Sequence, residues 1–262
     1  MWSHERQAMI LARLGRDGKV ATNDLAGEFD VSRETIRRDL LEMEGAGLLR
    51  RVHGGAVPGA APQPEPDFAA RLEQFAPQKE AIGRLACELI PQGVTCFIDA
   101  GTTTSAFARV LAARGDVRVI TNSFEIARIM TQGEGCDTLM LGGVPHADVP
   151  ATYGEMTLAE IDRFRVDFAV ISPVAVDRLQ GIADYELHEA EVARKMIRNA
   201  HSCIVLCHSA KLNTESRVAI CPLDEVQHLV TDDGGARFDL PRGEVHYAAL
   251  TPQQAERRSL AG

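Results

Sequence analysis

The strongest structural signal in this chain of 262 residues is the segment Ser32-Arg33-Glu34-Thr35-Ile36-Arg37-Arg38-Asp39-Leu40. Ser32 is a typical helix N-cap, because its hydroxyl can accept a hydrogen bond from a backbone N–H one turn later. After it, Ile36, Leu40 and Met43 recur at helical spacing and form one apolar stripe. The segment therefore predicts an amphipathic helix that begins at Ser32 and packs one face on a core.

The arginines of this helix lie off the apolar stripe. The guanidinium group is a planar fork that suits both guanine edges and phosphate oxygens. We therefore interpret the segment as the second helix of a DNA-binding helix-turn-helix, with Arg33, Arg37 and Arg38 reading bases or anchoring the backbone. The alternative is an ordinary surface helix with solvated charges, because arginine-rich amphipathic helices are common.

The flanking sequence favours DNA binding over that alternative. Upstream, Thr22 is expected to cap a short helix that ends near Phe29, and a tight connection follows. Downstream, Gly45 ends the second helix, and residues 48–55 (Leu-Leu-Arg-Arg-Val-His-Gly-Gly) indicate an extended arm and a glycine turn. This is the layout of a winged helix-turn-helix. The residues expected to contact double-stranded DNA are Ser32, Arg33, Thr35, Arg37, Arg38, Arg50, Arg51 and His53.

The net charge of −9 does not exclude a nucleic-acid partner, because the charge is unevenly distributed. Residues 1–57 carry nine basic and nine acidic residues, so the excess of acid lies in the remaining 19 basic and 28 acidic residues. The arginines of the predicted helix and wing can therefore meet phosphate locally.

Length and composition indicate a cytoplasmic protein with one small and one larger domain. A run of about 18 apolar residues, as a membrane span needs, does not occur, and the N-terminus lacks the order of a signal peptide. The cysteines show no C-x-x-C spacing and are expected to be buried free thiols. They are Cys87, Cys96, Cys136, Cys203, Cys207 and Cys221. Metal binding by Cys203, Cys207 and His208 is the alternative, although a zinc site usually needs four converging ligands. We expect no metal and no cofactor.

The composition changes after the wing. Between Gly54 and Asp67 the sequence is rich in Pro, Gly and Ala, which favours an extended, semi-stiff linker. We therefore predict a DNA-binding domain in residues 1–57, a linker in residues 58–77 and an effector domain in residues 78–250.

Short β-branched segments alternate with helical ones in the effector domain. This alternation is typical of a mainly parallel sheet covered by helices, so the predicted fold class is α/β. The expected strands are residues 94–98, 117–120, 138–141, 166–171, 203–207, 218–220 and 228–231. The expected helices are residues 79–89, 103–113, 124–131 and 186–199.

Ligands of such sheets bind beyond the carboxyl ends of the strands, where loops lead into helix N-termini. Residues 99–105 lie at such a place. Gly101 lets the backbone approach a ligand, threonine hydroxyls donate hydrogen bonds, and the helix offers free N–H groups and a positive end. This chemistry suits a phosphate, although neither a Walker loop nor a dinucleotide fingerprint is present. The alternative is a threonine-rich helix cap without a ligand.

Other strand ends are expected to converge on the same site. Asn122 and Ser123 follow one strand, Gly142 and Gly143 follow the next, and Lys211 follows a later one. Each motif alone is ordinary loop sequence. Their succession, one βα unit apart, strengthens the prediction of a phosphate site.

Taken together, residues 31–40, 48–56, 99–104, 121–123, 141–143, 189–191 with Lys195, and Lys211 resemble the DeoR family of bacterial transcriptional regulators. The resemblance implies repression of a carbohydrate or polyol operon, relieved by a phosphorylated sugar or polyol. It also implies an effector domain similar in fold to ribose-5-phosphate isomerase. The implied effector-binding residues are Asp99, Gly101, Thr102, Thr103, Thr104, Asn122, Ser123, Gly142, Gly143, Lys195 and Lys211.

The sequence also departs from the family pattern beside this site. Ser172 and Ala175 stand where glycines are usual, and His208 stands where an aspartate usually precedes the lysine. His146 stands where an arginine often follows the double glycine. These differences bear on which effector is bound rather than on its class.

Two other functions fit parts of the sequence. A sugar-phosphate isomerase needs a carboxylate and an opposing acid group. Its candidates would be Asp99, Glu189, Lys195 and Lys211. An isomerase has no use for a wing with Arg50 and Arg51, and a structural nucleoid protein should be strongly basic. We therefore expect a repressor rather than an enzyme, acting as a homo-oligomer, either a dimer or a tetramer, on paired half-sites.

Overall fold

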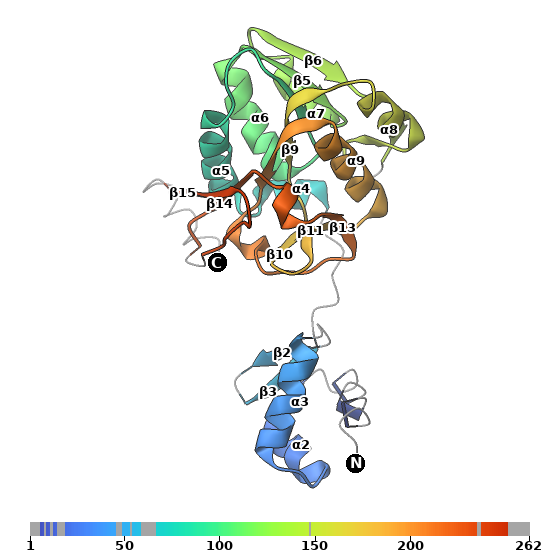
Figure 1. Ribbon diagram of the computed structural model, residues 1–262, viewed down its shortest axis with the longest axis vertical. Helices are drawn as coiled ribbons and strands as arrows, with labels where there is room; N and C mark the ends of the chain where they lie inside the picture. Colours follow the sequence, from blue (N-terminus) through green and yellow to red (C-terminus); the bar gives the residue numbers. More distant parts are fainter. Residues whose placement is uncertain are drawn as a thin grey trace. The chain divides into compact units, whose positions relative to one another are not determined.

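The computed structural model describes residues 6–7, 9–10, 13–14, 19–45, 49–52, 54–58, 67–146, 148–234 and 237–250. The chain divides into two units, Met1–Gln63 and Pro64–Gly262 (Figure 1). The division falls within residues 58–77, the segment predicted to be a linker.

The first unit contains the two expected helices and a small antiparallel sheet. The helices are α2 (Thr22–Glu28) and α3 (Arg33–Gly45). The strands are β1 (Val20–Ala21), β2 (Leu49–Val52) and β3 (Gly55–Pro58), in the order β1-β3-β2. Ile36, Leu40 and Met43 are all buried against Ile10 and Leu14, which confirms the predicted apolar stripe.

Thr22 does not cap α2, contrary to the prediction. It is the first helical residue, and the capping position is Ala21, whose side chain makes no capping hydrogen bond. Ala21 belongs to β1, so the strand runs directly into the helix. The Thr22 N–H donates to the Gly54 carbonyl at 2.8 Å instead.

Seven of the described strands of the second unit form one sheet in the order β15-β14-β12-β9-β4-β5-β6. They are β4 (Thr95–Ile98), β5 (Val117–Thr121), β6 (Cys136–Met140), β9 (Val166–Ile171), β12 (Ala200–Leu206), β14 (His228–Asp232) and β15 (Glu244–Ala248). Every neighbouring pair is parallel, which confirms the predicted sheet and places all the carboxyl ends at one edge. We call this edge the ligand edge.

Helices cover both faces of the sheet (Figure 1). They are α5 (Ala76–Glu88), α6 (Thr102–Arg114), α7 (Phe124–Met130), α8 (Glu155–Ile161) and α9 (Leu187–Arg198). Residues of α5, α6 and α7 pack on one face with Ile98 and Val119, whereas residues of α9 pack on the other with Phe97 and Ile120. Because adjacent strand residues point to opposite faces, two separate apolar cores result.

Part of the predicted linker is helical. Helix α4 (Phe68–Glu73) begins after Asp67, whose carboxylate accepts a hydrogen bond from the Ala70 N–H at 2.7 Å, and α5 begins at Ala76. The predicted linker therefore extends too far, because the proline-rich sequence ends at Pro66 and Asp67 is already the N-cap of a helix.

The predicted strand at residues 218–220 exists but does not join the parallel sheet. It is β13 (Val218–Cys221), which pairs antiparallel with β11 (Gly181–Asp184), and β11 pairs with β10 (Ala175–Asp177). A further hairpin consists of β7 (Val144–Pro145) and β8 (Thr152–Tyr153). Two short 3₁₀ helices are η1 (Ser209–Lys211) and η2 (Leu223–Glu225).

All six cysteines are free thiols, as predicted, and Cys136 is half-buried whereas the other five are buried. Cys203 and Cys207 lie four residues apart along β12 and the residue after it, or roughly 13 Å at the rise of a strand. That separation does not bring them together with His208 as metal ligands. Among the described helices, none is both long enough and apolar enough to cross a membrane.

Candidate functional site

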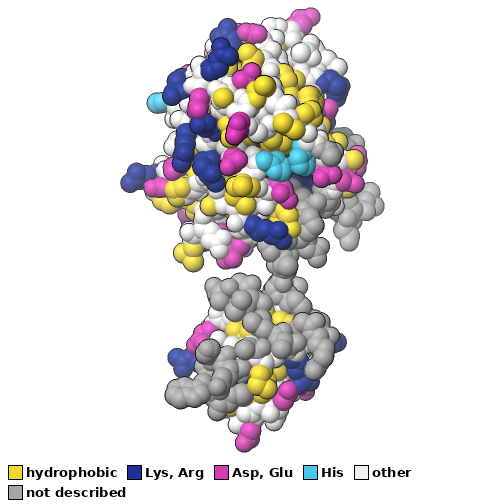
Figure 2. All heavy atoms as spheres, turned by 90° about the vertical axis from the view of Figure 1, so that its right-hand side faces the viewer, with side chains coloured by type: hydrophobic (Ala, Val, Ile, Leu, Met, Phe, Trp, Pro, Cys, Tyr) yellow, Lys and Arg dark blue, Asp and Glu magenta, His cyan; other side chains and the backbone are white. Residues whose placement is uncertain are grey.

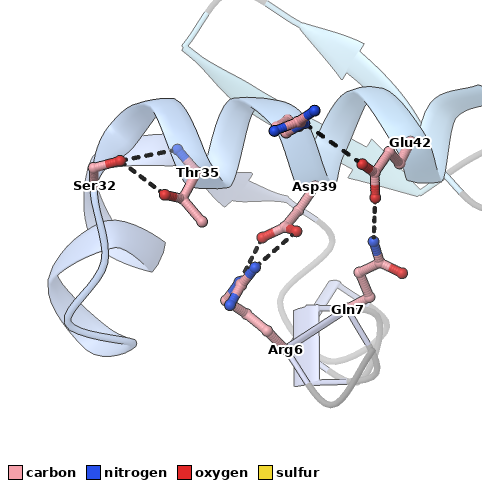
Figure 3. Close-up of polar contacts among 7 residues, drawn as sticks. Arg6, Gln7, Ser32, Thr35, Asp39 and Glu42 are labelled. Atoms are coloured by element: carbon pink, nitrogen blue, oxygen red, sulfur yellow. Dashed lines mark hydrogen bonds and ion pairs between the residues drawn. The ribbon is translucent and has the colours of Figure 1, made fainter. Parts of the chain in front are cut away.

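The start of α3 is fixed by the predicted N-cap. The Ser32 Oγ accepts a hydrogen bond from the Thr35 N–H at 3.1 Å and lies 2.8 Å from the Thr35 hydroxyl (Figure 3). The Ser32 carbonyl accepts from the Ile36 N–H at 3.2 Å. Ser32 and Thr35 therefore hold the first turn of the helix and stand at its exposed end.

The arginines of α3 point away from the core. Arg33 is exposed, and the side chains of Arg37 and Arg38 are 68% and 83% exposed. Arg37 pairs with Glu34 at 3.6 Å, and Arg38 pairs with Glu42 at 3.8 Å. Exposed ion pairs of this kind contribute little, so these guanidinium groups can exchange their partners for DNA phosphates or bases.

A buried ion pair anchors α3 from the opposite side. The Arg6 Nε and Nη2 atoms donate to the two Asp39 carboxylate oxygens at 2.5 and 2.9 Å, and both side chains are buried (Figure 3). The hydrogen bonds to Asp39 raise the pKa of Arg6 against the effect of burial. Gln7 also donates to Glu42 at 3.1 Å. Sequence patterns did not reveal this anchor, because Arg6 and Asp39 are 33 residues apart.

The wing is tied to the end of α3. The Arg51 N–H donates to the Glu44 carboxylate at 2.8 Å, and the Arg51 Nε lies 3.2 Å from the same group. A side chain at Gly55 would lie 1.9 Å from the Val20 carbonyl oxygen, so the close approach of β3 to β1 requires glycine. The Arg50 side chain and His53, both predicted to contact DNA, lie outside the described residues.

A groove of about 660 Å³ separates α3 from the wing and the start of α2. Arg33, Arg37 and Arg51 line it, together with Asn23. Leu41 is 55% exposed beside Arg37 and Arg51, and it is an apolar contact that the sequence patterns did not assign to the DNA surface. The surface combines guanidinium groups with exposed apolar side chains, as base-edge and phosphate contacts require.

The second candidate site lies at the ligand edge, where β4 leads into α6. The Asp99 carboxylate is buried and accepts a hydrogen bond from the Ala100 N–H at 2.7 Å. Burial, and then the charge of Glu189, raise the pKa of Asp99 to about 8. The Gly101 carbonyl accepts from the Thr104 hydroxyl at 3.0 Å. Thr104 therefore serves the helix start, whereas the Thr102 and Thr103 hydroxyls make no hydrogen bond within the described part of the chain.

The end of the next strand, β5, is occupied mainly by contacts within the fold. Asn122 donates to the Thr152 carbonyl at 3.1 Å, while its buried Oδ1 has no partner among the described atoms. The Ser123 Oγ caps α7 by accepting from the Ile126 N–H at 3.3 Å. The Asn122 Oδ1 is thus the atom of this pair that can still accept a hydrogen bond from a ligand.

The glycines after β6 are required by the close approach of α8. The Gly142 N–H donates to Glu160 at 2.6 Å, and the Gly142 carbonyl accepts from the Thr157 hydroxyl at 2.7 Å. At Gly143, where φ is +144°, a side chain would lie 2.1 Å from the Thr157 Oγ1. The double glycine therefore keeps the loop tight against α8 beside the site.

Lys211 lies at the ligand edge but Lys195 does not. The Lys211 Nζ donates to the Pro173 carbonyl at 2.9 Å, and the preceding residue, Ser172, is adjacent to Gly101. The Lys195 Nζ lies 2.7 Å from the Asp162 carboxylate, ahead of the amino end of β9. Helix α9 runs from the ligand edge back to the start of β12, so Lys195, in its last turn, lies at the opposite edge. The prediction that groups Lys195 with Asp99 is therefore wrong.

Buried acidic groups converge on Asp99. Asp184, at the end of β11, is buried, and burial together with Glu189 raises its pKa. The Tyr153 hydroxyl donates to Glu189 at 3.4 Å, and burial and the nearby carboxylates raise its pKa. Sequence patterns alone did not single out Asp184 and Tyr153. Buried carboxyl groups hydrogen-bond strongly to hydroxyl groups, so this cluster suits the hydroxyls of a sugar or polyol.

The histidines that depart from the family pattern border this cluster or the Lys211 loop. The His146 ring stacks on His188 at 4.5 Å between centroids, and His188 meets the Tyr153 ring edge-on at 4.5 Å. His208 stacks on Phe75 at 4.2 Å. Burial, with the charges of Lys211 and Lys79, lowers the pKa of His208 to about 3, so it is neutral near pH 7.

Comparison with known proteins matches both units. Residues 6–58 match a DeoR-like helix-turn-helix domain, and residues 74–233 match the DeoR C-terminal sensor domain. The glycerol-3-phosphate regulon repressor of Haemophilus influenzae is 33% identical over 92% of this chain and 92% of its own. The transcriptional repressor GlcR of Bacillus subtilis is 33% identical over 88% of this chain and 89% of its own. Ribose 5-phosphate isomerase A of Methanocaldococcus jannaschii, a solved structure, is 20% identical over 53% of this chain and 55% of its own, with a TM-score of 0.40.

Two motifs, residues 164–168 and 184–189, also resemble glycerol-3-phosphate regulon repressors. The relatives carry the names of repressors, and the helix-turn-helix match accounts for the first unit, so the function is transcriptional regulation rather than catalysis. The chain belongs to the DeoR family and is a DeoR-type, DNA-binding transcriptional repressor with a C-terminal sensor domain.

Proposed function

We propose that this repressor controls a carbohydrate or polyol catabolic operon and leaves its operator when a phosphorylated sugar or polyol binds at the ligand edge. One observation carries the proposal: the start of α6, the buried carboxyl groups of Asp99 and Asp184, and the half-buried Glu189 lie at the same place. A helix N-terminus favours a phosphate, and the carboxyl groups favour hydroxyls. The proposed ligand carries both.

The phosphate is proposed to lie on Gly101, Thr102 and Thr103. The Thr102 and Thr103 side chains are 7% and 2% exposed, and their hydroxyls are free to donate. Lys211 contributes positive charge from the neighbouring loop. The names of two relatives, repressors of a glycerol-3-phosphate regulon in Haemophilus influenzae and Escherichia coli, support glycerol 3-phosphate as the first compound to test.

In the first unit, α3 is proposed to enter the major groove with Arg33, Arg37 and Arg38, while Arg51 of the wing contacts the DNA backbone. A single DNA-binding unit, here called the head, makes a small interface with DNA. Two heads are therefore expected to bind paired half-sites of the operator in the cytoplasm. A homo-oligomer, dimer or tetramer, supplies the pair.

The face of the sensor unit that carries α8 and α9 exposes apolar side chains among charged ones (Figure 2). The most exposed apolar side chains of these helices and the β7–β8 hairpin are Val144 at 70%, Met156 at 62% and Leu187 at 58%. Adjacent exposed apolar groups often mark an association surface. This face supports self-association of the sensor unit.

Release requires that the ligand bind the arrangement unable to bind DNA more tightly than the arrangement that binds it. Replacing Thr103 by Val removes one hydroxyl while keeping the side-chain shape. We expect normal operator binding by Thr103→Val. The ligand concentration that releases DNA should rise by roughly tenfold, since one lost hydrogen bond to a charged group costs about 1.5 kcal/mol or more.

The test is fluorescence anisotropy of labelled operator, chosen by selection from random DNA, titrated with glycerol 3-phosphate and then with other sugar phosphates. The matched control is Lys195→Ala, at the opposite edge of the sheet, which should respond as the wild type does. Equal responses from Thr103→Val and the wild type would show that the phosphate does not bind at the start of α6. Loss of release in Lys195→Ala alone would mean that Lys195 does bind the effector, as the resemblance implied.

A further inference from the structure

A separate group of potential ligands lies on β14 and β15, at the amino end of this strand pair. The two strands are parallel, with His228 opposite Glu244 and Val230 opposite His246. Because alternate residues of a strand point to the same face, Glu244 and His246 share the face that carries His228. Two imidazole rings and one carboxylate therefore meet at the edge of the sheet opposite the ligand edge.

The geometry of this group approaches that of a metal site. The His228 Nδ1 and His246 Nε2 atoms are 3.1 Å apart, and the His246 Nε2 is 3.8 Å from the Glu244 Oε2. The three ligand atoms lie within 4.8 Å of one another. A tetrahedral zinc ion with ligands at about 2.0–2.1 Å holds neighbouring ligand atoms roughly 3.3 Å apart. Only the Glu244 carboxylate has to move closer.

The surroundings permit that movement. Glu244 begins β15, and its side chain is 76% exposed, so it can rotate without disturbing the core. Both histidine rings are half-buried on strands and already face one another, with a centroid separation of 5.3 Å. A rigid pair of imidazoles and one adjustable carboxylate is a suitable framework for a bound ion.

Contrary to the expectation from sequence that the protein binds no metal, we propose that His228, Glu244 and His246 bind one divalent transition-metal ion of the zinc type. Imidazole nitrogens and carboxylate oxygens are the usual non-thiolate ligands of zinc. Two histidines and one carboxylate leave a fourth position, which water or an external ligand fills. This site is independent of the sugar-phosphate site and of its proposed effector.

The competing explanation is a plain hydrogen bond between the two rings. Such a bond accounts for the 3.1 Å separation, but it assigns no role to Glu244. The two explanations differ in what Glu244 does, so this residue provides the sharpest test.

The bound ion would strengthen the attachment of β15 to β14, with which it already pairs. Among the described strands, β15 is the last in the order, and it pairs with β14 along one side. An ion that bridges the two strands binds the folded arrangement and stabilises it by mass action. We therefore expect zinc to raise the melting temperature of the full chain.

The experiment uses the full-length protein, stripped of metal with a chelator and titrated with zinc chloride against a chromophoric chelator. The wild type should bind one ion at this group, and cobalt substitution should give visible absorption bands. Glu244→Gln keeps the exposed strand surface and should weaken zinc binding at least about tenfold, the scale on which even supporting residues act. His246→Gln should abolish the cobalt bands.

His201→Gln is the matched control, because His201 is an exposed histidine on β12 outside this group. It should keep the wild-type zinc affinity, cobalt bands and zinc-dependent rise in melting temperature. Equal zinc affinity in the wild type, Glu244→Gln and His246→Gln would overturn the proposal. So would a wild type that shows neither binding nor a stability change at millimolar zinc.

Discussion

The charged groups of α3 and those at the ligand edge are in opposite environments. On α3, the Arg37 and Arg38 side chains are 68% and 83% exposed, and their ion pairs are long. At the ligand edge, Asp99 and Asp184 are 6% and 4% exposed, and burial raises the pKa of both. Water screens the first set of charges, whereas the fold has removed the second set from water.

This difference matches the two kinds of partner. DNA is a long polyanion, and exposed arginines bind it by displacing counterions, at little desolvation cost. A small metabolite makes few contacts, so each one has to be strong, and hydrogen bonds are stronger where water is excluded. The head should therefore tolerate the loss of one surface charge better than the sensor tolerates a change in its buried carboxyl groups.

The largest expected effect comes from the Arg6–Asp39 pair, a buried ion pair in the described part of the first unit and an exception to this contrast. Asp39→Ala leaves Arg6 buried without its carboxylate, which is expected to cost about 3–5 kcal/mol of stability and to abolish operator binding. Urea denaturation and anisotropy measure the two effects. Glu34→Ala, which removes the exposed partner of Arg37, is the control and should change stability little. Wild-type stability in Asp39→Ala would show that the pair does not anchor α3.

The second prediction tests the buried side of the comparison. The pKa of Asp99 rises from its ordinary 3.8 to about 8 on folding, so the folded protein holds a proton that the unfolded chain releases between these values. This stabilising contribution is complete below about pH 4 and is lost as the pH rises through about 8. The slope is at most about 1.4 kcal/mol per pH unit.

Asp99→Asn keeps a neutral side chain at every pH and should flatten that slope. Thermal melts between about pH 5 and pH 8 measure it, with Asp162→Asn as the control, because Asp162 is exposed at the opposite edge. Parallel stability curves for Asp99→Asn and the wild type would mean that Asp99 remains charged, and that the contrast between the two regions is smaller than the fold suggests.

The smallest expected effects are on the DNA surface and distinguish reading from anchoring. Arg37→Ala should cost about 1–3 kcal/mol of operator binding and relax the preference at one base pair. Arg51→Ala in the wing should instead weaken all sequences alike and reduce the salt dependence by about one phosphate contact. Competition binding with operator and scrambled DNA at several salt concentrations separates the two. Identical behaviour of both variants would assign Arg37 to the backbone.

The parts of the fold that sequence predicted best depend on local patterns. The stripe of Ile36, Leu40 and Met43 determines α3, and the alternation of helices and β-branched segments determines the parallel sheet. β15 was not predicted, because its sequence, Glu-Val-His-Tyr-Ala, is that of a half-buried edge strand with little apolar signal.

Long-range convergence was beyond such patterns. Asp184 and Tyr153 join Asp99 only because separate loops end at one edge, and Arg6 reaches Asp39 across 33 residues. Lys195 shows the reverse error. It matches a family motif in sequence, yet the path of α9 carries it to the far edge. Spacing along a chain identifies the helix or strand to which a residue belongs. It does not show at which edge of the sheet the residue lies.

The distribution of the thiols has a practical consequence for studying this repressor. Cys136 is the half-buried cysteine, and the other five are buried. It begins β6, opposite Val117 of β5, so it lies at the edge of the sheet away from the proposed sugar-phosphate site. Burial raises its thiol pKa, which makes mildly alkaline solution the better medium for alkylation. An environment-sensitive dye would therefore attach first at a native position on the sensor unit, without introduced cysteines and without blocking the ligand edge.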